Sequence, residues 1–421
     1  MLSHFFFADI LNSMRLIHTS DWHLGRLFYG QRRDGVLPAF LEWLTQLIAQ
    51  EKIEGLIVAG DIFDTTTPSH AALTSYFNFL HRALACGCRH IVIVGGNHDS
   101  PSLLNASKEL LSPMGVTVVG QATEDPADEV VLLKDAHGSP QAVVIAVPFL
   151  RERDVRVLSE HESAIDTERK IREGTARHYE RCLERALELR GDAPIPIIAT
   201  GHLFAAQARV TESTRDLYVG SLGQIPADVF PEAIDYLALG HIHGRQLIGG
   251  IETRCYCGAP IPFDFSEAAL ERSVTIVDTD ARTCKPRRIP VPAFDRLVSL
   301  QGTPQELLDA IRKLKKNSNT ALEVFCEAHC TVAGVGDLAE QLATAAQQAG
   351  IKLVRTTCAR LETGDMLAEE TITELEQMSP REMFEIVLEN NTQTLDEPTK
   401  SALRLAHADI VNELLTADTN A

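Results

Sequence analysis

Five short segments place carboxylate, amide and imidazole side chains directly after apolar runs. They are Asp21-Trp22-His23, Gly60-Asp61-Ile62-Phe63-Asp64, Gly96-Asn97-His98-Asp99, Gly201-His202 and Gly240-His241-Ile242-His243. Oxygen and imidazole ligands without thiolates suit Mn²⁺, Fe²⁺ or Zn²⁺. The candidate ligands are too many for one ion but suffice for two ions that share a bridging carboxylate; they are Asp21, His23, Asp61, Asn97, His202, His241 and His243. The pattern therefore indicates two metal ions acting on a phosphoester.

Taken singly, these residues have simpler interpretations. Asp21, Asp61 or Asp64 alone could cap a helix, Asn97 could be a turn residue, and His202 could be a hydrogen-bonded core histidine. Four of the five motifs also place glycine immediately before a candidate ligand, where the chain must turn tightly. Together the motifs favour a metal site. We expect the histidines outside the motifs to be ordinary: His18, His70, His81 and His90.

Apolar runs, most of them containing β-branched residues, precede the motifs and recur along the chain, at 15–18, 55–59, 91–94, 142–147, 195–199 and 236–239. Runs of this kind are typical of strands buried on both faces. Amphipathic helical patterns at 36–50, 71–85 and 167–190 alternate with them. The alternation predicts an α/β fold, a β-sandwich flanked by helices, in which the carboxyl ends of the strands bring the ligands to one edge.

The chain changes character after residue 290. Residues 291–361 alternate strand, helix, strand, helix and strand (296–300, 304–314, 321–327, 335–348 and 352–356), which predicts a small α+β domain. Residues 362–421 predict two helices, near 379–388 and from about 398, which could form a domain of their own or dock on a partner. Residues 1–13 are interpreted as an N-terminal extension of the domain at 14–290.

Composition narrows the class of protein. The 421 residues are 45% hydrophobic and 23% charged, as in ordinary globular proteins, and no apolar stretch approaches a membrane span. The nine dispersed cysteines predict reduced thiols in a cytosolic protein. The net charge is -19, but residues 362–421 alone hold 14 acidic and 3 basic side chains, a balance of -11. The remaining -8 does not exclude a surface that handles DNA.

The motif order DxH, GDxxD, GNHD, GH and GHxH resembles the calcineurin-like metallophosphoesterase superfamily. The segments 15–25, 60–65, 147–151, 238–243 and 256–262 resemble the bacterial family of SbcD nuclease subunits in particular. The resemblance covers nearly the whole chain and is looser after residue 290. It implies a metallophosphoesterase nuclease domain at 14–290, a capping domain at 291–361 and a helical partner-binding tail at 362–421.

Carried over by motif, the resemblance implies two overlapping ligand sets. Asp21, His23, Asp61 and His243 would bind the first metal, and Asp61, Asn97, His202 and His241 the second, with Asp61 as the bridge. His98 would face the scissile phosphate without binding metal, and Asp99 would hold its ring. Position 64 is Asp where archaeal and eukaryotic relatives carry a histidine, which leaves its role open.

The same family pattern implies cleavage of DNA with Mn²⁺, as an exonuclease on duplex ends and an endonuclease on hairpins or single strands. It also implies an SbcC-like coiled-coil ABC ATPase as partner, a homodimer within a heterotetramer, and a cytoplasmic, nucleoid-associated protein without membrane contact. The tail helices would dock at the base of the coiled coil. The basic side chains Arg312, Lys313, Lys315 and Lys316 could contact DNA phosphates or simply end a helix.

Two other classes remain open. A phosphomonoesterase or cyclic-nucleotide phosphodiesterase would share the metal motifs but would not need residues 292–421. A catalytically inactive scaffold would be expected to have lost ligands, and no expected ligand is missing here.

Overall fold

The computed structural model describes residues 13–33, 35–156, 164–205, 225–314, 323–332 and 337–359, and six residues of the tail. Its contacts divide the chain into two units, Met1–Ala359 and Arg360–Ala421. The expected N-terminal extension, apart from Ser13, and most of the tail lie outside the described residues. In the described part, no helix is both long and apolar enough to span a membrane.

Two six-stranded sheets form the centre of the first unit. The first has the order β12-β11-β1-β2-β3-β4 and contains β1 (Arg15–Thr19), β2 (Gly55–Ala59), β3 (His90–Val94), β4 (Val116–Val119), β11 (Ser273–Asp280) and β12 (Thr283–Pro290). The second has the order β5-β6-β7-β8-β10-β9 and contains β5 (Val130–Lys134), β6 (Pro140–Ile145), β7 (Ile197–His202), β8 (Tyr236–Gly240), β9 (Gln246–Ile248) and β10 (Ile251–Tyr256). Strands β1 to β4 are parallel to one another, and so are β6, β7, β8 and β10.

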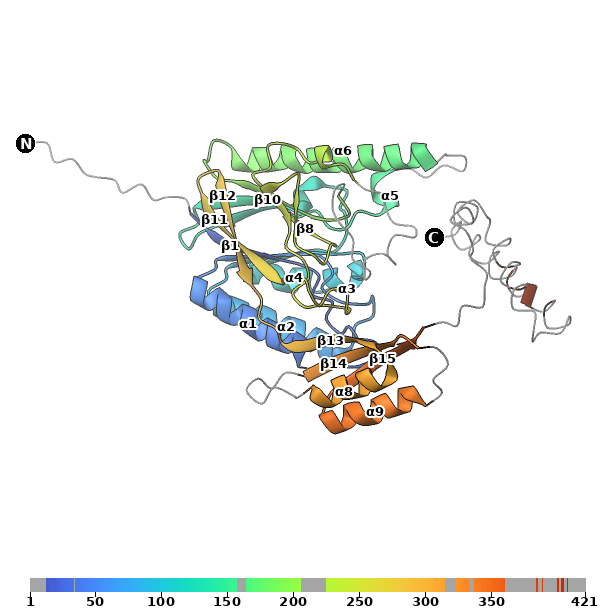
Figure 1. Cartoon of the computed structure of the whole chain (residues 1–421). Coiled ribbons are helices and arrows are strands. Elements are labelled where there is room, and N and C mark those ends of the chain that lie inside the picture. The colour runs from blue at the N-terminus through green and yellow to red at the C-terminus, as the bar shows by residue number, and fades with distance from the viewer. Residues whose placement is uncertain are drawn as a thin grey trace, which may run out of the picture. The chain divides into compact units, whose positions relative to one another are not determined.

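The two sheets pack face to face, and helices cover their outer faces. Ile57 and Val92 of the first sheet meet Val144 and Ile198 of the second in one buried cluster. Helices α1 (Val36–Glu51) and α2 (His70–Ala85) lie on the outer side of the first sheet, and α6 (Ala164–Arg190) lies on the outer side of the second (Figure 1). The predicted α/β fold, a sandwich flanked by helices, is confirmed.

Local sequence explains where these elements form. Helix α1 buries the apolar stripe that includes Phe40, Leu44 and Ile48. At the start of α2, the Ser69 hydroxyl accepts a hydrogen bond from the amide of Ala72. Three shorter helices also lie in the described part of this domain: α3 (Pro101–Asn105), α4 (Lys108–Leu111) and α5 (Glu152–Val155).

His18 and the cysteines take the ordinary roles expected of them. His18 is fully buried between the sheets, with Nδ1 3.0 Å from the Tyr236 hydroxyl and Nε2 3.2 Å from the Leu239 carbonyl oxygen. Burial lowers its pKa to about 3, so the ring is neutral. All nine cysteines have free thiols.

The region expected to be a capping domain contains β13 (Asp295–Gly302), α8 (Pro304–Lys313), β14 (Glu323–Cys330), α9 (Leu338–Ala349) and β15 (Lys352–Cys358). The structure refines the α+β expectation, since the three strands are all parallel and are joined by helix crossovers. Helix α8 begins with a reciprocal capping box between Thr303 and Glu306. A buried ion pair between Arg33 and Asp295, and ring contacts between Phe28 and Phe325, hold this region against the sandwich.

The described tail residues, 384, 388, 400, 403, 404 and 407, are all helical and fall within the two segments predicted to be helices. Phe384 stacks on His407 with ring centroids 4.0 Å apart. The choice between a separate domain and a partner-docking segment rests on residues outside this described set.

Candidate metal centre

The candidate ligands come from strand ends of both sheets. Asp21 and His23 follow β1, Asp61 follows β2 and Asn97 follows β3, whereas His202 ends β7 and His241 and His243 follow β8. The carboxyl ends of these strands meet at one edge of the sandwich, and the structure brings all seven side chains together there. The sequence predicts one edge, but the contribution of two sheets is visible only in the structure.

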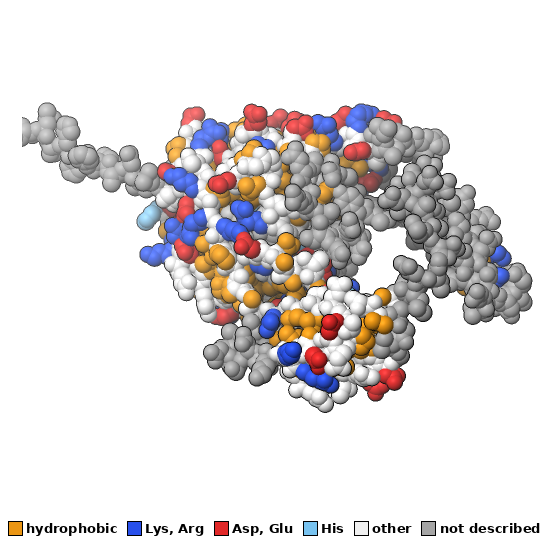
Figure 2. Space-filling view, viewed as in Figure 1, with side chains coloured by type: hydrophobic (Ala, Val, Ile, Leu, Met, Phe, Trp, Pro, Cys, Tyr) orange, Lys and Arg blue, Asp and Glu red, His pale blue; other side chains and the backbone are white. Residues whose placement is uncertain are grey.

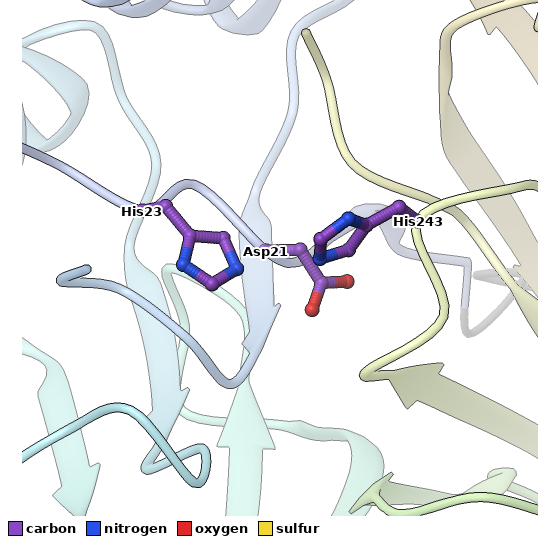
Figure 3. A group of neighbouring side chains, drawn as sticks. All are labelled: Asp21, His23 and His243. Carbon is purple, nitrogen blue, oxygen red and sulfur yellow. The ribbon is translucent and has the colours of Figure 1, made fainter. Parts of the chain in front are cut away.

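Asp21, His23 and His243 form the first group. Their ligand atoms lie within 4.8 Å of one another, and all three side chains are buried. Figure 3 shows the three side chains next to one another, on loops that follow two different strands. The Asp21 carboxylate also accepts a hydrogen bond of 2.9 Å from the His241 amide, which ties the loop after β8 to the loop after β1.

Asp61, His202 and His241 form the second group, again with ligand atoms within 4.8 Å of one another. The Asn97 amide oxygen lies 3.0 Å from His202 Nε2 and 3.1 Å from His241 Nδ1. Asp61 Oδ2 lies 3.2 Å from His202 Nε2 and 3.5 Å from Nε2 of His23, which belongs to the first group. One carboxylate oxygen therefore lies between the two groups.

The residues present fit a pair of divalent cations. His23 Nε2 and Asp61 Oδ2 are buried and have no hydrogen-bond partner. A buried polar atom without a partner costs about 1–3 kcal/mol, which a bound cation would offset. The donors are carboxylate, amide and imidazole, which suit a divalent metal of the Mn²⁺, Fe²⁺ or Zn²⁺ type.

Hydrogen bonds on the far side of the imidazole rings set their orientation. His202 Nδ1 donates to the Ala59 carbonyl oxygen at 2.9 Å, and His243 Nδ1 lies 2.9 Å from Glu267 Oε1. Because a carbonyl or carboxylate oxygen accepts the Nδ1 proton, the Nε2 lone pair is directed into the site. Outer partners of this kind are a regular feature of protein metal sites.

Glu267 is a site residue that the sequence did not reveal. It is fully buried, and its Oε2 accepts hydrogen bonds from the Phe263 amide at 3.0 Å and from Arg272 at 2.9 Å. The Phe263 ring in turn packs edge-on against His23 and His243, with centroids 4.8 and 5.0 Å away. Glu267 belongs to no motif and is brought to His243 only by the fold.

Asp64, whose role the sequence left open, also contacts a candidate ligand. Its Oδ1 lies 3.3 Å from His23 Nδ1 and accepts a hydrogen bond of 2.9 Å from Arg26. Burial opposes the charged form, but His23 and Arg26 hold the pKa of Asp64 below its usual value. Asp64 can therefore attract the His23 ring electrostatically, whereas Glu267 holds His243 by a hydrogen bond.

The expectation that Asp99 holds the His98 ring is wrong. The Asp99 carboxylate accepts hydrogen bonds from the backbone amides of Ile62, Phe63 and Gly96, at 2.8 to 3.1 Å. The ring is held instead by the backbone carbonyl of Asp64, 2.9 Å from His98 Nδ1. Asp99 thus fixes the Asp61 loop against the His98 loop and acts on the ring only indirectly.

The backbone is strained at the candidate ligands. Seven non-glycine residues of the described part have positive φ, and four of them are Asp21 (54°), His23 (46°), Asp61 (50°) and His241 (96°). Residues with a Cβ rarely adopt backbone conformations with positive φ, and such strain concentrates at functional sites. The strain here marks the same residues as the sequence motifs.

Two glycines allow the close packing of the loops. Gly60 has φ of +89°, and a Cβ there would lie 2.1 Å from His202 Nδ1. A Cβ on Gly96 would lie 2.1 Å from Asp61 Oδ1, although its backbone conformation is ordinary. Gly60 therefore allows a tight turn before Asp61, whereas Gly96 allows the backbone before Asn97 to approach Asp61 closely.

Charges in the site shift one another strongly. Burial lowers the pKa of His202, but Asp61 raises it to a net value of about 9. Burial, and then His202, lower the pKa of His241 to about 3. Burial opposes the charged form of Asp61, yet His202 and His23 hold its pKa well below the usual value. Burial and Asp61 together raise the pKa of Asp99 to about 6. Opposed shifts among neighbours are typical of functional sites.

A further group of potential ligands shares no residue with this centre. Glu129, His178 and Cys182 approach one another behind the second sheet, but Glu129 already accepts hydrogen bonds from Thr123 and lies 2.7 Å from His178 Nε2. We interpret this group as a network that anchors α6.

Of the basic residues considered as contacts for DNA phosphates, Arg312 lies 3.5 Å from Asp309, while Lys315 and Lys316 are outside the described residues.

Comparisons with known proteins match both parts of the chain. The family model described as calcineurin-like phosphoesterase matches residues 14–245, and the model described as type 5 capsule protein repressor C-terminal domain matches residues 293–392. The chain is 39% identical to the SbcD subunit of the SbcCD nuclease from Escherichia coli, over 69% of this chain and 71% of that one. It is 34% identical to the corresponding protein of Rhodobacter capsulatus, over 72% and 76% of the two chains. It is also 34% identical to that of Bacillus subtilis, over 63% and 66%.

Proposed function

The chain belongs to the family of SbcD nuclease subunits, within the calcineurin-like phosphoesterases, and we propose on this premise that it hydrolyses DNA phosphodiester bonds with two divalent cations. Membership of this family makes it a metal-dependent nuclease. The proposal extends this activity to a mechanism with two cations and to DNA substrates.

The position of Asp61 carries the two-cation proposal. Its buried Oδ2 lies between His23 of one ligand group and His202 of the other. Asp21, His23, Asp61 and His243 would hold one cation, and Asp61, Asn97, His202 and His241 the second. Bound there, the cations supply positive charge that stabilises the transition state at phosphorus and acidifies the attacking water.

His98 is the residue that we assign to proton transfer. The Asp64 carbonyl fixes its ring through Nδ1, so a proton can be delivered only from Nε2. His98 also lies beside the first ligand group, with its ring centroid 4.8 Å from that of His23. Protonation of the leaving 3′ oxygen by such a group typically contributes about 10²–10⁴ in rate.

The family supports a wider assignment. We propose Mn²⁺ as the cation, an SbcC-like coiled-coil ABC ATPase as the partner, and a homodimer within a heterotetramer in the cytoplasm, associated with the nucleoid. In that assembly ATP would stimulate exonuclease cleavage of duplex ends and endonuclease cleavage of single strands or hairpins. The names of the relatives, which are subunits of an SbcCD nuclease, support the choice of partner, and the other parts of this assignment are implied by the family resemblance.

Cleavage of end-labelled linear duplex DNA by the purified protein with Mn²⁺ tests the proposal. Chelation should stop cleavage, and His98→Ala should reduce its rate by about 10²–10⁴. His81→Ala is the matched control, because His81 is exposed on α2 and should leave the rate unchanged. Full activity of Asp61→Ala would contradict the site assignment. Cleavage of a small chromogenic phosphodiester without cleavage of any DNA, with the partner present, would favour a small-molecule phosphodiesterase.

A further inference from the structure

An open pocket with a volume of about 440 Å³ lies beside the metal centre. Its walls come from residues 24–27, 32–33, 64–65 and 67–69 and from the first turns of α1 and α2, and we call it the arginine pocket. Asp64 links the pocket to the metal centre, because it lines the pocket and its Oδ1 lies 3.3 Å from Nδ1 of the candidate ligand His23. Asp64 approaches His23 at Nδ1, whereas Nε2 of the same ring faces Asp61 in the metal centre. The pocket is therefore separated from the metal centre by the His23 side chain, and a DNA strand bound at the metals can reach it.

The side chains that line the arginine pocket carry a small net positive charge in an acidic protein. Three arginines and one carboxylate line the pocket, although the whole chain has a net charge of -19. Elsewhere, on the face shown in Figure 2, basic and acidic side chains are interspersed. Arg33 forms a buried ion pair with Asp295, and Arg26 donates to Asp64 at 2.9 Å. Arg32 is exposed, so its charge is available to an anionic ligand.

The rest of the wall suits a ligand that is only partly polar. Thr65, Thr67 and Ser69 offer hydroxyl groups, whereas Leu24, Leu27 and Pro38 offer apolar surface. Leu27 is 52% exposed, so an apolar part of a ligand can pack against it. A volume of this size lies within the range of about 300–1,000 Å³ of small-molecule sites and can admit one nucleotide.

We propose that the arginine pocket receives one nucleotide of the DNA strand whose scissile phosphodiester lies at the metal centre. Arg32 and Arg26 contact its phosphate, and the apolar wall packs against its sugar or base. The inference rests on the proposed nuclease function and extends it, because it assigns a site outside the metal ligands to the substrate strand. Arg32 acts here in binding and takes no part in the chemical step.

Binding of deoxyadenosine 5′-monophosphate to the full chain, with metals removed by a chelator, isolates the pocket from the metal centre. Calorimetry should detect binding to the wild type, and Arg32→Ala should weaken it by about tenfold, since a charge-assisted contact to phosphate is lost. Arg89→Ala is the matched control. Arg89 pairs with Glu54 at the amino ends of the strands, away from the pocket, and its removal should leave binding unchanged.

Deoxyadenosine without phosphate is the second probe, and Arg32→Ala should not change its weaker binding. With Mn²⁺ and duplex DNA, Arg32→Ala should raise KM with kcat retained, and the slope of log KM against log salt should fall by about one. Equal binding of the monophosphate by wild type and Arg32→Ala, or an unchanged salt slope, would overturn the pocket assignment. Failure of the wild type to cut DNA would refute the nuclease proposal instead, and the metal-free measurement would still test the pocket.

Discussion

Replacing Glu267 by Gln tests whether the metal centre depends on its outer hydrogen bonds. In the wild type, one carboxylate oxygen lies 2.9 Å from His243 Nδ1 and the other accepts from the Phe263 amide and from Arg272. Glutamine has one acceptor and one donor end. Whichever way it turns, its amide group faces at least one donor, so either His243 or the Phe263 and Arg272 pair loses its acceptor.

The size of the effect follows from these contacts. Loss of an outer-shell partner of a metal-bound histidine typically weakens metal affinity by about 10–100-fold, or about 1.4–2.8 kcal/mol. Because Glu267 is fully buried, loss of a hydrogen bond to its charged carboxylate should also lower the free energy of unfolding by about 1.5–3 kcal/mol. Binding and stability should therefore both decrease, by similar amounts.

Calorimetric titration with Mn²⁺ and denaturant unfolding measure the two quantities separately. Glu271→Gln is the control, because the Glu271 side chain is 78% exposed and pairs with Arg288 at the surface. An E267Q protein that is less stable but binds Mn²⁺ with wild-type affinity would refute the reasoning. Glu267 would then support the fold and not the ligand geometry.

Other contacts described above lead to three further predictions. Gly96→Ala should weaken Mn²⁺ binding by at least about tenfold in calorimetry, because its Cβ would lie 2.1 Å from Asp61 Oδ1; Gly35→Ala, with open space at the Cβ, should not. His18 has a pKa of about 3 when folded and about 6.5 when unfolded, so its stabilisation is complete above pH 6.5 and is lost as pH falls toward 3. The loss amounts to at most about 5 kcal/mol, and His18→Gln should flatten the profile of unfolding free energy against pH over that window. Asp64→Asn should lower nuclease activity by about tenfold, less than loss of His98, because the backbone carbonyl that holds His98 remains.

Local sequence signals account for much of the fold and of the ligand set. Each candidate ligand follows an apolar run, and parallel strands bring their ends together, so Asp21 and Asp61 could be expected to meet. The capping box at Thr303 likewise marks the start of α8 where the structure has it. Elements such as these depend on residues close together in the chain.

Contacts made by tertiary structure alone could not be anticipated. Asp99 follows His98 directly, but its carboxylate turns to amides of a loop that follows a different strand. Glu267 reaches His243 from a loop whose sequence has no periodic pattern, and its position depends on Arg272. In both cases a buried carboxylate lies where hydrogen-bond donors can satisfy it. The sequence does not reveal which donors these are, because they come from distant parts of the fold.

The left-handed backbone at Asp21, His23, Asp61 and His241 lowers the stability of the fold at residues that the activity requires. Each such residue costs on the order of 1–3 kcal/mol, and glycine would adopt the same conformation without that cost. A screen for heat resistance alone should therefore favour glycine at these positions and yield proteins that are more robust but inactive. Heat-stable variants of this fold that have lost their ligands would be the expected by-product of selection without function.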